Sequence, residues 1–371
     1  MFKLHFFSNS AYFRCAIVAL AVCGSLQVLA SDPVDDFGAL AEREIRTLAG
    51  QFPGRMGGTP QEAAAADYLV TRLRAFGYAP VVDEFPVNYR FVPEDGEDVE
   101  VRQAVSRNIV AEIKGQGEGL IIIGAHYDTA VARRPDDVAL GVGGPDLEGV
   151  DDNASGVGVL LELAQRLAAY RPEPTVRFIA FGAEEVGLLG ARHVVDKLTD
   201  AERESLVIMI NIDSIVTGDY LYVHAGPSTL SSHPQAAAMR DQAIAIAAEL
   251  GVEMRINPGL NADYPAGTGC CSDQAAFDEA GLPVINIEAT NWRLGELDGF
   301  QQTDVSEAFP KGESWHSASL DRLAYLEANL PAGRIRERSA QVVSILMELL
   351  RLQADLDNGA PGLEQMTQQL L

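Results

Sequence analysis

Four short segments of the chain are almost continuously apolar and rich in β-branched residues. They cover residues 120–125, 175–181, 206–212 and 283–288. Runs of this kind are typical of strands that a largely parallel sheet buries on both faces. Between and after them, longer stretches carry apolar residues at helical spacing. These predict helices over residues 154–170, 190–197, 199–205, 234–250, 272–280 and 333–357.

The pattern before residue 120 predicts further helices and strands. Helical periodicity runs from residue 33 to residue 48. Thr59-Pro60-Gln61-Glu62 has the form of a capping box with proline at the first helical position, and it opens a second helix that Gly77 ends. Strands are predicted at 81–85, 87–92 and 108–114, with an acidic loop before the last of them.

The order of these elements defines a fold class. The chain has 371 residues, of which 47% are hydrophobic, so it can bury one large core or two modest ones. The sequence shows neither an internal repeat nor a linker long enough to separate domains. Strands that alternate with helices favour α/β architecture. We therefore predict a single-domain α/β/α sandwich with a central, largely parallel mixed sheet.

The first thirty residues have the features of a secretory signal peptide. Lys3 and Arg14 precede an apolar run over residues 15–29, and a cleavage site follows that ends at Ala30. The run is too short for a membrane span, and the residue before Cys23 is too bulky for lipoprotein cleavage. The sequence predicts a mature domain of residues 31–371 that is periplasmic or secreted in a bacterium and free of the membrane.

The chain is strongly acidic. Its formal charge is −25, and loss of Lys3 and Arg14 with the signal peptide takes it to −27. Such a surface repels nucleic acid and anionic membranes, so neither is expected as a partner. It favours cationic ligands, although charge spread over a surface does not locate a pocket.

Two of the four cysteines remain after residue 30, and they are the adjacent pair Cys270 and Cys271. Adjacent cysteines can form a vicinal disulfide, pair between chains, or stay buried and free. Zinc ligation by this pair is not expected, because structural zinc sites space their cysteines two to four residues apart. The chain is no disulfide scaffold.

Polar residues gather where the predicted strands end. Beyond the carboxyl ends of parallel strands is where ligands bind in open α/β sheets. Two further polar stretches lie elsewhere: one directly precedes a predicted helix, and the other lies in a loop near the C-terminus. The residues concerned are His126 and Asp128, Glu184 and Glu185, Asp213, the stretch Asp151-Asp152-Asn153, and His316.

Each of these motifs has an ordinary structural explanation when taken alone. Asp152 or Asn153 can cap a helix, Glu184-Glu185 can be solvated charge, and Asp213 can end a turn. Their joint occurrence in this order favours a site that binds two metal ions. The remaining histidines of the mature chain, at positions 193, 224 and 233, are assigned no role.

These motifs resemble the zinc aminopeptidases of peptidase family M28, in clan MH. His-x-Asp, Asp-Asp-Asn-Ala-Ser-Gly, Glu-Glu, Asn-x-Asp and a late His follow the family's order over nearly all of residues 31–371. The resemblance implies a zinc-dependent exopeptidase fold, two zinc ions per chain, and peptide or protein N-termini as substrates. Zinc accepts imidazole and carboxylate ligands, and a catalytic site keeps one position open for water.

The resemblance also implies a role for each residue. Asp152 would bridge two zinc ions, with one ion completed by His126 and Asp213 and the other by Glu185 and His316. Glu184 would be the general base, and Asp128 would orient the ring of His126. Many family members have tyrosine directly before the last histidine. Here the residue is Trp315, whose indole N–H can still donate to an oxyanion or to substrate.

Segments outside these motifs point to one branch of the family. Residues 52–56, 257–261, 267–271 and 288–292 resemble periplasmic bacterial members that trim N-terminal arginine from alkaline phosphatase subunits. This implies a preference for N-terminal Arg or Lys, which needs a desolvated carboxylate in the pocket. Asp219, Asp273 and Asp298 are the candidates.

Two alternatives stay open from the sequence. The first is a glutaminyl cyclase-like acyltransferase with the same fold and a single zinc. The second is a non-catalytic binding protein that keeps the fold. The presence of every expected ligand and of the base argues against the second.

Overall fold

The computed structural model describes residues 36–93, 98–261, 263–294, 301–310, 312–354 and 356. The chain divides into Met1–Ala30 and Ser31–Leu371, and all described residues belong to the second unit. The predicted signal peptide therefore lies outside the described residues, and so does Asp298.

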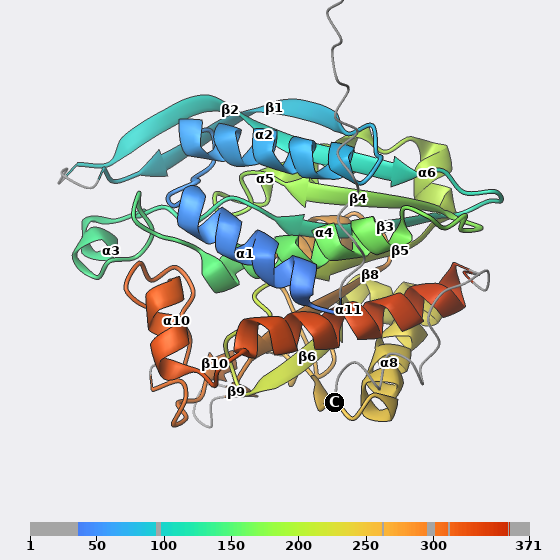
Figure 1. The fold of residues 1–371 in the computed structure, drawn as a ribbon. Coiled ribbons are helices and arrows are strands. Elements are labelled where there is room, and N and C mark those ends of the chain that lie inside the picture. The colour runs from blue at the N-terminus through green and yellow to red at the C-terminus, as the bar shows by residue number, and fades with distance from the viewer. Residues whose placement is uncertain are drawn as a thin grey trace, which may run out of the picture. The chain divides into compact units, whose positions relative to one another are not determined.

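An eight-stranded mixed sheet forms the centre of this unit (Figure 1). The strand order is β1-β2-β4-β3-β5-β8-β6-β7. The four central strands β4, β3, β5 and β8 run parallel to one another, whereas β2 and β6 join them antiparallel. β9 and β10 form a separate hairpin. The strands are β1 Val81–Phe91, β2 Glu100–Ile113, β3 Leu120–His126, β4 Thr175–Phe181, β5 Leu206–Ile212, β6 Tyr220–Ala225, β7 Met254–Ile256, β8 Val284–Thr290, β9 Trp292–Leu294 and β10 Gln301–Thr303.

Helices cover both faces of the sheet, which confirms the predicted α/β/α class. Alternate residues of each strand point to opposite faces, so Ile121 and Ile123 enter one core and Leu120 and Ile122 the other. The first core packs against α1, α2, α4, α8 and α11, and the second against α5 and α9. The helices are α1 Ala39–Gln51, α2 Pro60–Ala75, α3 Pro135–Ala139, the π-helical turn η1 Val150–Ser155, α4 Gly156–Leu167, α5 Leu189–Lys197, α6 Asp200–Ser205, α7 Pro227–Ser232, α8 Pro234–Glu249, α9 Gln274–Glu279, α10 Leu323–Asn329 and α11 Arg334–Gln353.

The N-terminal strands differ from the prediction. The two strands expected at 81–85 and 87–92 are one strand, β1, which runs through Pro86. β1 is the edge strand of the sheet, where a residue without an N–H costs no ladder hydrogen bond on the open side. β2 begins at Glu100, eight residues before the predicted start, because its first part pairs with β1 over the full length of that strand.

The predicted capping box at α2 is only half formed. Thr59 Oγ1 accepts the backbone N–H of Glu62 at 3.2 Å, as expected. The Glu62 carboxylate does not return to Thr59; it accepts the N–H of Gly58 at 2.6 Å and the hydroxyl of Ser106 at 2.5 Å. Glu62 thereby ties the start of α2 to β2. Among the residues that the structure describes, no helix has the length and apolar character needed to cross a membrane.

Candidate metal centre and substrate pocket

The carboxyl ends of the parallel strands bring the predicted residues to one edge of the sheet. His126 is the last residue of β3, Glu184 and Glu185 follow β4, and Asp213 follows β5. All of them line one cavity of about 570 Å³, together with Asp152. The topology of the sheet therefore brings together side chains that are far apart in the sequence.

Asp152 lies in the turn η1, whose backbone is not helical at Asp152 and Asn153 and which the sequence did not predict. The predicted helix at 154–170 begins only at Gly156, and the peptide between Asp152 and Asn153 is cis. Of the two predicted capping residues, Asn153 is the one that bonds the start of α4: its Oδ1 accepts the N–H of Gly156 at 2.8 Å. The carboxylate of Asp321 accepts the N–H groups of Asp151 and Asp152 at 2.7 and 3.1 Å. These bonds hold the backbone and leave the Asp152 side chain free for the cavity.

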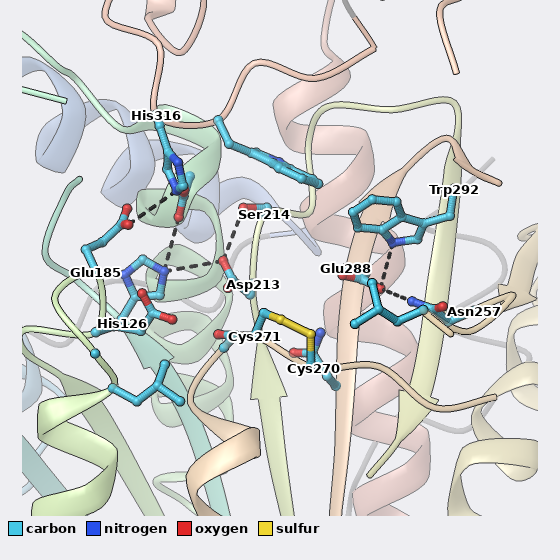
Figure 2. A pocket seen from close by; sticks show the side chains of 18 of the residues that line it. His126, Glu185, Asp213, Ser214, Asn257, Cys270, Cys271, Glu288, Trp292 and His316 are labelled. Atoms are coloured by element: carbon cyan, nitrogen blue, oxygen red, sulfur yellow. Dashed lines mark hydrogen bonds and ion pairs between the residues drawn. A yellow bond between two sulfur atoms is a disulfide. The ribbon is translucent and has the colours of Figure 1, made fainter. Parts of the chain in front are cut away.

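The carboxylate of Asp152 faces one histidine with each oxygen. His126 Nε2 lies 3.1 Å from Oδ1, and His316 Nε2 lies 3.2 Å from Oδ2. Asp213 Oδ1 lies 3.4 Å from His126 Nε2, and Glu185 Oε2 lies 3.3 Å from His316 Nε2. Two groups of three ligands thus share Asp152. We call these five residues the acid–histidine cluster; Figure 2 shows part of it.

The acid–histidine cluster fits zinc. In each group of three, one ligand atom per residue lies within 4.8 Å of the others. Imidazole and carboxylate are zinc donors, and three protein ligands leave a position open. Glu185 Oε1 is buried and has no hydrogen-bond partner among the described residues, as expected for an oxygen that faces a cation.

Glu184 lines the same cavity but belongs to neither group of three. Burial raises the pKa of its carboxyl well above the ordinary value; His126 opposes this shift, and Glu185, Asp273 and Asp213 add to it. A carboxylate that is in the cavity and free of the ligand groups is placed to exchange protons with a substrate.

Asp128 lies beside the ring of His126, as expected, and also contacts the loop after β4. Its carboxylate oxygens accept the backbone N–H groups of Glu184 at 2.9 Å and of Glu185 at 3.2 Å. The ring of His126 contacts the backbone oxygen of Asp128 at 3.3 Å, whereas the carboxylate is 3.7 Å from Nδ1, beyond hydrogen-bond distance. Asp128 therefore connects the loops after β3 and β4.

The predicted substrate contacts have mixed outcomes. Trp315 lines the cavity, and its buried Nε1 has no hydrogen-bond partner among the described residues. Asp219 is not part of the lining; its carboxylate accepts Asn291 Nδ2 at 2.8 Å. Asp273 is fully buried and also absent from the lining. These two aspartates are corrections to the sequence prediction, and Asp298 lies outside the described residues.

The acid in the cavity that the sequence analysis missed is Glu288, near the end of β8. The predicted strand 283–288 ended at this residue, so the rule that polar side chains follow parallel strands applied to it as well. Cys270 and Cys271 also line the cavity and form a vicinal disulfide, one of the three states left open from the sequence.

Comparison with known proteins defines the class. The family model described as "Peptidase family M28" matches residues 108–342. The chain is 40% identical over 340 residues to the alkaline phosphatase isozyme conversion protein of Escherichia coli, covering 91% of this chain and 96% of that protein. It is 30% identical to aminopeptidase YwaD of Bacillus subtilis over 56% of this chain, and spans 41% of that relative's length.

Solved structures share the fold. A zinc aminopeptidase from Bacillus subtilis superimposes with a TM-score of 0.62 at 16% identity, over 92% of this chain and 100% of that one. A glutaminyl cyclase from Porphyromonas gingivalis gives 0.56 at 20% identity, over 87% and 100%. The chain belongs to peptidase family M28, and it is a zinc-dependent aminopeptidase. The glutaminyl cyclase alternative is not better supported.

Proposed function

We propose that this enzyme removes basic residues from the N-termini of exported peptides or proteins, using a dinuclear zinc centre. The observation that carries the dinuclear part is the position of Asp152, whose two oxygens face His126 and His316 separately. The preference for Arg or Lys rests on the Escherichia coli relative, named an alkaline phosphatase isozyme conversion protein. Alkaline phosphatase subunits are accordingly a candidate substrate.

Each residue has a proposed part in the reaction. His126, Asp152 and Asp213 would hold one zinc ion, and Asp152, Glu185 and His316 the other. When bound, zinc polarises the scissile carbonyl and lowers the pKa of the attacking water. Glu184 takes a proton from the water and returns it to the leaving amine.

Two further residues support this arrangement. Asp128 accepts the backbone N–H groups of Glu184 and Glu185. It thereby holds the proposed base and the neighbouring zinc ligand in fixed positions relative to each other. Trp315 lines the cavity, and no described residue accepts its buried indole N–H; this group can donate to the carbonyl oxygen as negative charge develops on it.

We also propose that residues 1–30 are removed during export and that residues 31–371 act in the periplasm or outside the cell. Lys3, Arg14 and the apolar run 15–29 support this proposal. N-terminal sequencing of enzyme recovered from a periplasmic fraction should start at Ser31. Recovery of the intact chain from the cytoplasm alone would contradict it.

Zinc stoichiometry tests the dinuclear centre. Elemental analysis of zinc-loaded, dialysed enzyme should give close to two zinc ions per chain. Asp152→Asn should impair both sites, whereas the surface variant Asp83→Asn should bind zinc normally. One firmly bound ion, with no second on titration, would contradict the dinuclear centre and favour a cyclase-like site, which conversion of an N-terminal glutamine peptide would reveal.

A panel of p-nitroanilides tests the substrate class. At fixed ionic strength, kcat/KM should be highest for Arg, lower for Lys and lowest for Glu, with Leu as the apolar reference. Arg should lead because its planar fork pairs bidentately with a carboxylate. A clear lead for Leu would show a general aminopeptidase with an apolar pocket.

A further inference from the structure

Glu288 has an unusual set of contacts for a buried acid. Its side chain is only 13% exposed. Both of its hydrogen bonds go to the same oxygen: Oε1 accepts Asn257 Nδ2 at 2.8 Å and Trp292 Nε1 at 2.9 Å. None of the described residues donates a hydrogen bond to Oε2. The carboxylate is therefore held firmly by one oxygen and leaves the other open.

No arginine or lysine among the described residues forms an ion pair with Glu288. Among the described residues, the basic group paired with Glu288 is His224, whose Nε2 is 3.6 Å from Oε1. Burial lowers the pKa of His224 to about 4, so its ring is neutral near pH 7. Burial likewise raises the pKa of Glu288 to about 7. An acid buried without a cation costs stability, and an incoming cation would relieve that cost.

The position of Glu288 suits a substrate side chain. It lines the cavity that also contains the acid–histidine cluster. In Figure 2, Glu288, Asn257 and Trp292 lie on the opposite side of this pocket from His126 and Glu185, with the disulfide between them. A residue whose scissile carbonyl is at the cluster would extend its side chain toward Glu288.

The walls beside Glu288 suit a cation as well. The rings of Trp292 and Trp315 are 5.4 Å apart between centroids, and both tryptophans line the cavity. Indole faces attract guanidinium and ammonium groups, and a desolvated carboxylate beside them adds charge pairing.

We propose that Glu288 is the specificity-determining residue of this aminopeptidase, with Oε2 accepting hydrogen bonds from the guanidinium or ammonium group of an N-terminal Arg or Lys. The packed indoles of Trp292 and Trp315 line one wall beside the cation, and Asn257 holds the carboxylate in place. The inference rests on the proposed preference for N-terminal Arg or Lys, and it replaces Asp219 and Asp273 as the acids that read the substrate.

The test is the ratio of kcat/KM for Arg-p-nitroanilide to that for Leu-p-nitroanilide at pH 8. Glu288→Gln keeps an oxygen for Asn257 and Trp292 but replaces the open oxygen with an amide nitrogen. The ratio should fall about 10–100-fold, the range expected for a lost charged hydrogen bond. The matched control Asp219→Asn removes a carboxylate outside the cavity and should leave the ratio unchanged.

The outcomes separate the two proposals. Wild-type enzyme that shows no preference for Arg over Leu contradicts the proposed substrate class itself. Wild-type enzyme that prefers Arg, with an unchanged ratio in Glu288→Gln, overturns the role of Glu288. Zinc content and melting temperature of each variant report folding. If Glu288→Gln does not fold, Glu288→Asp retains the charge with a shorter reach and should lower the ratio at least about threefold; an unchanged ratio there overturns the inference.

Discussion

Single residues around the cavity adopt backbone conformations that side chains usually avoid. Five non-glycine residues among those described have positive φ: Ala183, Leu188, Ser214, Cys271 and His316. Four of them line the cavity, and Ala183 directly precedes Glu184. Such conformations cost free energy and persist where surrounding structure enforces them. Their concentration around the cavity indicates that the surrounding structure holds the backbone of the site in place.

The adjacent residues Glu184 and Glu185 have different proposed roles and lead to a prediction. Glu184→Gln should bind zinc as the wild type does, because Glu184 belongs to neither ligand group. Its kcat should fall about 10²–10⁴-fold, the usual contribution of general acid–base transfer. The comparison is Glu185→Gln, which should instead weaken zinc binding. Near-normal turnover by fully metallated Glu184→Gln would show that another group is the base.

Glu288 leads to a pH dependence that distinguishes substrates. Its pKa of about 7 means that the carboxyl gains a proton as the pH falls through 7. The Arg-to-Leu ratio of kcat/KM should therefore be high above pH 7 and fall below it, since only Arg needs the charge. Titration at the acid–histidine cluster affects both substrates and cancels in the ratio.

The groups that face Glu288 do not titrate in this range. His224 has a pKa lowered by burial to about 4, and burial raises the pKa of Tyr222, which pairs with Glu288 across the sheet. Asp213 adds negative charge and raises the pKa of Glu288 further. The measurement is kcat/KM for the Arg and Leu substrates from pH 5.5 to 8.5, in the wild type and in Glu288→Gln. A flat ratio in the wild type would contradict the assignment.

At the scale of elements, the parallel strands were predictable and the remainder less so. Strands buried on both faces are continuous apolar runs, so β3, β4, β5 and β8 follow from composition alone. β6 was missed because Tyr222 and His224 interrupt its apolar character, although pairing with β8 buries it. Helix starts shifted by a few residues where turn chemistry, as at η1, replaced a simple cap.

The candidate site follows the same division. His126, the Glu184-Glu185 pair and Asp213 come directly after predicted strands, so topology alone groups them. His316 lies in a loop; the sequence suggested it only through its joint occurrence with the other motifs, and the family resemblance gave it a role. The sequence prediction of the substrate-reading acid differs from the structure because charge in a sequence does not show which carboxylates line the cavity. Asp219 is not part of the lining, and Glu288 is.

Arg55 connects two of the loops that carry the site. It is fully buried and donates to the backbone oxygen of Tyr127 at 2.5 Å, of Glu148 at 2.6 Å and of Gly149 at 2.7 Å. These bonds join the loop after β3 to the turn that delivers Asp152. Burial lowers the pKa of Arg55 to about 10, which still leaves it charged near pH 7.

Replacing Arg55 should therefore loosen the site from a distance. Arg55→Lys keeps the charge but cannot present a planar fork to three carbonyl oxygens. We expect a loss of about 2–5 kcal/mol in the free energy of unfolding, because buried carbonyls lose their donors, together with weaker zinc binding. The control is Arg107→Lys, which alters a partly exposed ion pair with Glu84. It should change both the free energy of unfolding and zinc binding very little. Denaturant unfolding and zinc titration measure both effects. Normal stability in Arg55→Lys would show that the carbonyls find other donors.

At the scale of the whole molecule, an acidic chain buries several of its carboxylates next to one another at the site. The chain carries a formal charge of −25, and Asp152, Glu184, Glu185 and Asp273 are all buried beside one another's charges. Buried like charges repel, and His126 and His316 can offset only part of this. A doubly charged ion at each ligand group would remove most of the repulsion.

Zinc removal should therefore lower the stability of the whole domain. A ligand that binds only the folded state adds about 2.7 kcal/mol per site when its free concentration is 100 times the dissociation constant. For a domain of residues 31–371, each such site corresponds to a rise in melting temperature of roughly 4 °C, because the unfolding entropy grows with chain length. Chelation should reverse that rise, and added zinc should restore it. The rise should be much smaller in Asp152→Asn than in Asp83→Asn, since only the former residue faces both histidines. Equal rises in the two variants would mean that zinc stabilises the protein from somewhere other than the acid–histidine cluster.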